Sequence, residues 1–149
     1  MSQTSTSPFA FSSPAPELHL VEQEPEEKSL RILLAEDNHE LRRLLSFVLR
    51  REGHTVVEVS DASALLEALA FAIVDGGRES FDVVICEQNI PGIPGLAVLE
   101  GLRASARATP FILISGNAGV HEKARALGAV VLDRPLTVGA IRGAVQRSG

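Results

Sequence analysis

The chain has 149 residues, of which 45% are hydrophobic, and this length supports one domain with a proper core but not two domains of ordinary size. Six Phe and no Trp or Tyr offer little surface for stacking bases, so binding of single-stranded nucleic acid is not expected. No apolar run approaches the ~20 residues of a membrane span, and the single cysteine, Cys86, fits a reducing compartment, so we expect a cytosolic protein.

The N-terminal residues 1–29 are rich in Ser, Pro, Thr and Glu. Such a segment buries too little apolar surface to offset its ordering entropy, so we predict a disordered tail that is simply solvated. The alternative is an interaction tail that binds through the apolar patch Leu18–Val21. Residues 31–149 hold 14 acidic and 13 basic residues, and this near-neutral balance gives no electrostatic reason to expect nucleic-acid binding.

From residue 30 onward, short apolar runs alternate with segments of helical periodicity. Strands are predicted at 30–35, 54–59, 81–86, 110–115 and 129–133. Helices are predicted at 41–49, 62–74, 96–102, 120–127 and 138–147. Asp61 and Thr137 are suitable N-caps for the second and last helices. Strict alternation with right-handed crossovers predicts an α/β fold, a doubly wound parallel sheet with helices on both faces.

Polar side chains stand where four of these strands end. They are Glu36 and Asp37 after the first strand, Glu87 after the third, Ser115 after the fourth and Arg134 after the fifth. Ligands of open parallel sheets bind outside the carboxyl ends of the strands, so we expect these groups to share one rim. Strand ends often carry polar residues by chance, but an acidic pair directly after the first strand favours a site.

Four segments together resemble the receiver domain of two-component response regulators. They are RILLAEDN, FDVVICEQNIPGIPG, PFILIS and VLDRP, within residues 30–147. The resemblance implies a flavodoxin-like (βα)5 fold with strand order 2-1-3-4-5. It also implies an acidic pair for Mg²⁺, a phosphoryl acceptor, a hydroxyl and a lysine. The corresponding residues are Glu36 and Asp37, Glu87, Ser115 and Arg134, and the backbone carbonyl of Asn89 would complete the metal shell.

Two of these positions depart from the receiver pattern. The acceptor is Glu87 instead of Asp, and its carboxylate projects further by about one C–C bond, ~1.5 Å. In-line phosphoryl transfer depends on placement, so such a shift could lower the rate by about 100-fold or more. The lysine is replaced by Arg134, which suits pairing with a carboxylate. We therefore predict a Glu87–Arg134 salt bridge, with Ser115 donating a hydrogen bond to the same carboxylate.

The functional expectation is an atypical receiver, or pseudo-receiver, held in one state by its own side chains. It would be a single-domain response regulator without enzymatic activity, acting by protein–protein interaction in two-component signalling. Residues 118–147 would dock a histidine kinase or a downstream effector. No cofactor is required, although weak Mg²⁺ binding by Asp37, Glu36, Glu87 and the Asn89 backbone stays open.

Three alternatives remain. One is a phosphorylatable receiver that uses Glu87 with Mg²⁺. Another is a Mg²⁺-dependent phosphatase or phosphotransferase, which would need a reliable nucleophile after the first strand that AEDNHE does not supply. The third is a flavin or nucleotide carrier, but Glu36 and Asp37 would repel phosphate at the position where such a carrier binds it.

Overall fold

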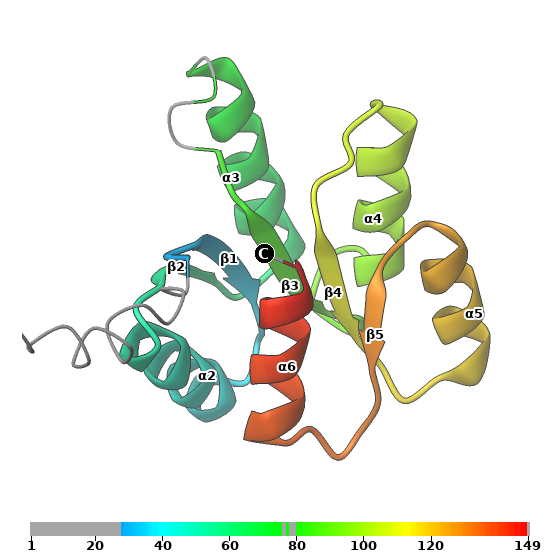
Figure 1. Cartoon of the computed structure of the whole chain (residues 1–149). Coiled ribbons are helices and arrows are strands. Elements are labelled where there is room, and N and C mark those ends of the chain that lie inside the picture. Colours follow the sequence, from blue (N-terminus) through cyan, green and yellow to red (C-terminus); the bar gives the residue numbers. More distant parts are fainter. Residues whose placement is uncertain (1–27, 76, 78–79, 149) are drawn as a thin grey trace, which may run out of the picture.

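The computed structural model describes residues 28–75, 77 and 80–148, so almost all of the predicted tail (1–29) lies outside the described residues. Within them, strands and helices alternate strictly (Figure 1). In chain order they are β1 (Arg31–Ala35), α2 (His39–Arg51), β2 (Thr55–Val59), α3 (Ala62–Val74), β3 (Val83–Glu87), α4 (Gly95–Ala104), β4 (Phe111–Ile114), α5 (Ala118–Ala126), β5 (Val130–Leu132) and α6 (Val138–Ser148). None of the helices in this part of the chain has the length and apolar character needed to cross a membrane.

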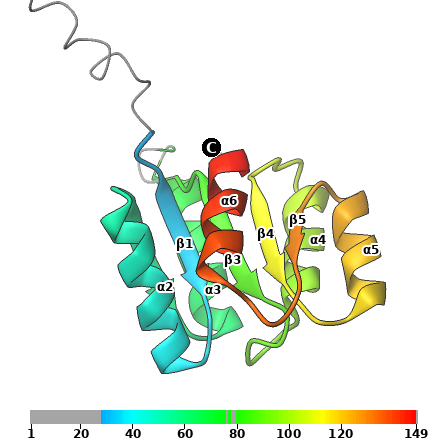
Figure 2. The same cartoon turned by 60° about the horizontal axis from the view of Figure 1, so that its bottom comes forward.

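All five strands are parallel and lie in the order β2-β1-β3-β4-β5, which confirms the predicted fold and strand order. In the register, Ala35 lies opposite Cys86, and Glu87 lies opposite Ile114. The strands therefore end near one another, and their carboxyl ends form one rim of the sheet (Figure 2). The residues that follow β1, β3, β4 and β5 are brought to this rim.

The sheet is buried on both faces because alternate residues of each strand point to opposite sides. One face packs against α2 and α6, where Ile32, Ile85 and Ile112 meet Leu45 and Ile141. The other face packs against α3, α4 and α5. Its core contains Leu33, Val84, Phe111, Leu113, Leu65, Leu99 and Ala124. The continuous apolar runs of the sequence thus reflect burial on two faces rather than one.

Side-chain caps fix where several helices begin. Asp61 Oδ1 accepts a hydrogen bond from the Ala64 amide at 2.8 Å, and Thr137 Oγ1 accepts one from the Ala140 amide at 3.0 Å, as predicted. The α4 helix begins one residue earlier than predicted, at Gly95. A Cβ atom at Gly95 would lie 2.8 Å from Leu113 Cδ1, so glycine lets α4 start tightly against the sheet beside the rim.

Candidate functional site

A cavity of about 290 Å³ at the rim gathers most of the predicted site residues. It is lined by Glu36, Asp37, Asn38, Leu41, Glu87, Asn89 and Arg134. The hydrogen-bonded neighbours β1 and β3 supply the carboxylates, and the segment after β5 supplies the guanidinium. Ser115, which follows β4, is not part of the lining.

Glu87 is the last residue of β3 and is only 3% exposed. Its Oε2 accepts a hydrogen bond from the Asn89 amide at 3.2 Å, and its Oε1 is paired with Nη2 of Arg134. Removing a carboxylate from water without a partner costs several kcal/mol. The Arg134 guanidinium, whose side chain is 42% exposed, supplies the compensating charge.

Glu36, directly after β1, is 2% exposed. Its Oε2 accepts a hydrogen bond from the Asn38 amide at 3.0 Å, whereas its Oε1 has no hydrogen-bond partner among the described residues. Burial raises the pKa of Glu36 above its ordinary value of 4.5, and the neighbouring Asp37 carboxyl raises it as well. The Asn38 hydrogen bond and the charge of Arg134 oppose this rise without cancelling it. Glu36 therefore holds a proton more readily than an exposed glutamate does.

The rim carboxylates do not fit a Mg²⁺ site of three carboxylates in this arrangement. In the described part of the chain, no three His, Cys, Asp or Glu side chains are grouped so that they could hold a metal ion. One oxygen of Glu87 faces Arg134 and the other faces the Asn89 amide. Oε1 of Glu36 is a buried oxygen without a hydrogen-bond partner among the described residues, and such an oxygen could be a metal ligand. Weak Mg²⁺ binding at the rim therefore stays a prediction.

Ser115 does not donate a hydrogen bond to Glu87, so that sequence prediction is wrong for the described residues. Ser115 Oγ instead accepts a hydrogen bond from the Asn117 amide at 3.0 Å, in the turn that leads into α5. The hydroxyl bonds to this amide rather than to Glu87 because Ser115 and Asn117 are only two residues apart in the same turn. The Ser115 carbonyl in turn accepts from Nε2 of His121, a buried residue of α5 that sequence reasoning missed.

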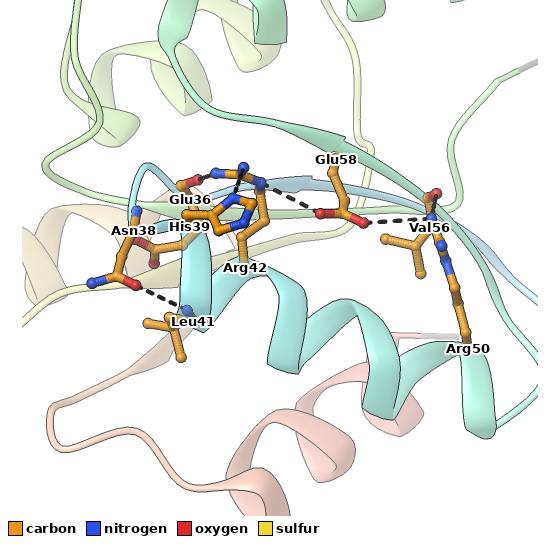
Figure 3. A network of polar contacts seen from close by, with 8 residues as sticks. All are labelled: Glu36, Asn38, His39, Leu41, Arg42, Arg50, Val56 and Glu58. Carbon is orange, nitrogen blue, oxygen red and sulfur yellow. Dashed lines mark hydrogen bonds and ion pairs between the residues drawn. The ribbon is translucent and has the colours of Figure 1, made fainter.

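Arg42 is a second residue that sequence reasoning missed, and Figure 3 shows its polar contacts with Glu36 and Glu58. Its Nη1 donates to the Glu36 carbonyl oxygen at 2.7 Å, and its Nε lies 3.4 Å from Glu58 Oε1. The Arg42 side chain is only 15% exposed. A guanidinium in the first turn of α2 therefore ties the loop that carries the acidic pair to β2. No sequence spacing signals such a side chain–backbone contact.

Comparisons with known proteins assign the chain to a family. Residues 32–137 match the model of the response regulator receiver domain. The chain is 44% identical over 87 residues to the transcriptional activator protein PfeR of Pseudomonas aeruginosa, covering 58% of this chain and 26% of PfeR. It is 35% identical over 94 residues to the transcriptional regulatory protein TcrA of Mycobacterium tuberculosis, covering 63% of this chain and 34% of TcrA. The chain thus spans about a third or less of these two relatives.

Solved structures show the same fold. The receiver domain of the hybrid histidine kinase CckA matches with a TM-score of 0.61 and 28% identity, over 79% of this chain and 97% of that one. The chemotaxis response regulator CheY4 of Vibrio cholerae matches with a TM-score of 0.64 and 20% identity, over 82% of this chain and 100% of that one. Together with the family match, these likenesses show that the chain belongs to the receiver domain family of two-component response regulators.

Proposed function

We propose that this receiver is atypical: it signals by binding a protein partner and not by reversible phosphorylation. The observation that carries the proposal is the ion pair between Glu87 and Arg134. At the position that corresponds to the phosphoacceptor, a fixed carboxylate carries about one negative charge, where a phosphoryl group would carry nearly two. The arginine balances this charge permanently and independently of any kinase.

Phosphoryl transfer to Glu87 is disfavoured on two grounds. Glu87 is only 3% exposed and its carboxylate is paired, so attack on a phosphorus atom would first require breaking the ion pair. Positioning is most of what accelerates phosphoryl transfer, and the three carboxylates are not grouped as ligands for the Mg²⁺ that would orient the donor. A lysine cannot easily take part, because Lys123 on α5 is the only one beyond residue 28.

The partner is proposed to dock on residues 118–147, which form α5, β5 and α6. Arg134 lies inside this segment, between β5 and α6, so the ion pair with Glu87 fixes one arrangement of the docking surface. A histidine kinase or a downstream effector would recognise that arrangement. In this proposal the protein is a cytoplasmic binding module, not an enzyme, and it needs no cofactor.

Incubation of the full chain with a small phosphodonor and Mg²⁺, followed by intact-mass measurement, tests the proposal. We expect no stoichiometric adduct on the wild type. The double variant E87D/R134K restores the receiver pattern at both positions and should gain the mass of one phosphoryl group, lost again in base. A stoichiometric, base-labile adduct on Glu87 of the wild type would instead establish the phosphorylatable alternative.

A further inference from the structure

The outer face of α2 combines positive charge with exposed apolar side chains. We call Arg43, Leu44, Phe47, Arg50 and Arg51 the basic face. Leu44 and Phe47 are 50% and 58% exposed, and the Arg51 guanidinium lies 5.7 Å from the centre of the Phe47 ring. Positions 43, 47 and 51 repeat every four residues, so they form one stripe along the helix.

The basic face is hollowed and keeps an excess of positive charge. A cavity of about 410 Å³ is lined by Arg43, Ser46, Phe47, Arg50, Arg51 and Glu58. Glu58 is the one acidic residue in this lining, and it lies 3.6 Å from Arg50 and 3.4 Å from Arg42 (Figure 3). Its charge is therefore shared between two arginines, while Arg43 and Arg51 have no ion pair among the described residues.

The sequence directly before the described residues has the complementary chemistry. Residues 17–27, ELHLVEQEPEE, hold five glutamates, no Lys or Arg, and the apolar Leu18, Leu20 and Val21. This segment accounts for all the acidic residues that precede residue 36. Its glutamates match the arginines of the basic face in charge, and its apolar residues match the exposed Leu44 and Phe47.

The described chain also begins beside the end of α2. Ser29 Oγ donates to the Gly53 carbonyl at 2.7 Å, and the Leu30 amide donates to Nδ1 of His54 at 3.0 Å. Figure 2 shows β1 starting at the end of the sheet where α2 finishes. The 13 residues of α2 span about 20 Å, whereas 11 extended residues reach up to ~36 Å. Residues 17–27 are thus long enough to run back along the whole helix.

We propose that residues 17–27 bind the basic face of α2 within the same chain, glutamates against Arg43 and Arg51 and apolar side chains against Leu44 and Phe47. A tether this short holds the segment at an effective concentration in the millimolar range, so individually weak contacts suffice. The bound segment covers the outer face of α2 and excludes other proteins from it. This inference does not depend on the state of Glu87.

A nitroxide spin label in the tail of the full chain tests the inference. The label is placed on Ser13→Cys, because the native Cys86 is fully buried and does not compete for it. If residues 17–27 run back along α2, the label lies near Arg43 and the amide NMR signals of residues 43–44 lose most of their intensity. If they do not, signals near the exit point, Gly53 and His54, are affected most.

Charge variants establish the specificity. The variant R43E/R51E, or about 0.5 M NaCl, should restore the signals of residues 43–44 because attraction between surface charges is lost. The variant K123E/R125E makes the same charge change on α5. It should not change the broadening, that is, the loss of signal intensity at residues 43–44. Combining E24R/E26R with R43E/R51E exchanges the two charges and restores the attraction, so the signals of residues 43–44 should again lose intensity.

Three outcomes would overturn the inference. One is broadening centred on Gly53 and His54. Another is broadening of residues 43–44 that R43E/R51E leaves unchanged. The third is broadening of unlabelled, ¹⁵N-enriched chains by added spin-labelled chains, since that would make a second copy the occupant of the basic face.

Discussion

Arg134 forms an ion pair with Glu87 although β4 separates their two strands in the sheet. Glu87 ends β3 at the centre of the sheet, and Arg134 follows β5 at its edge. The contact therefore spans the rim and fastens the start of the β5–α6 segment to the middle of the fold. A long side chain with a planar fork is suited to such a reach.

Removing Arg134 should destabilise the protein by leaving a buried carboxylate without its cation. Breaking a buried pair in this way typically costs 3–5 kcal/mol, and the exposure of Arg134 places Arg134→Ala at the lower end, about 3 kcal/mol. Urea denaturation measures the loss in the free energy of unfolding.

A double-mutant cycle separates the ion pair from other effects. Glu87→Gln removes the charge and keeps the shape, so Arg134→Ala in that background should cost about 1 kcal/mol or less. Equal costs of Arg134→Ala in both backgrounds would mean that the two side chains do not stabilise each other.

Glu36 should make the protein less stable as the pH rises. Because its pKa is raised in the folded state, the folded protein binds this proton more tightly than the unfolded chain does. The free energy of unfolding then falls as the pH rises from 4.5 through the raised pKa. Glu36→Gln cannot ionise and keeps an oxygen for the Asn38 amide, so it should stabilise the protein at pH 7 and do so less at pH 4.

Urea denaturation at pH 4, 5.5 and 7 measures this dependence. The matched control is Glu122→Gln on the exposed side of α5, expected to stay within about 0.5 kcal/mol of the wild type. A wild type that is more stable than Glu36→Gln at pH 7, by a margin that grows with pH, would contradict the assignment of burial as the dominant influence on Glu36.

Cys86 should be inert in the native protein. Its side chain is fully buried, and burial, followed by the charge of Glu36, raises the pKa of the thiol to about 12. At pH 8 the reactive thiolate fraction is then on the order of 10⁻⁴. A thiol reagent should detect one thiol per chain in concentrated urea and none in the native state over the same time. Native Cys86 reacting as fast as the unfolded chain would show that this part of β3 opens.

The sequence predicted the sheet because its pattern records burial directly. Strands covered on both faces need continuous apolar runs such as Ile32–Ala35, and parallel strands end on the same side. The rim residues could be predicted for the same reason, since Glu36 directly follows β1, Glu87 ends β3 and Arg134 comes shortly after β5. Their positions at the ends of predicted strands were what the pattern carried.

Two of the contacts that sequence reasoning missed involve backbone atoms of loops. The Ser115 hydroxyl meets the Asn117 amide, and the Arg42 guanidinium meets the Glu36 carbonyl. Such contacts depend on the path of a turn, which neither the helical nor the strand period encodes. The ion pair between Glu87 and Arg134 is easier to predict, because it depends only on the strand order and on the length of the two side chains.

Arg42 should be worth more to stability than its exposed neighbour Arg43. The Arg42 guanidinium donates to the Glu36 carbonyl and also pairs with Glu58, from two different nitrogens. Arg42→Lys keeps the charge but offers one compact ammonium, which cannot reproduce both contacts, so about 1–2 kcal/mol should be lost. Arg43→Lys is the matched control and should stay within about 0.5 kcal/mol of the wild type. Urea denaturation compares the two variants, and equal stabilities would mean that Arg42 does not hold the loop carrying Glu36.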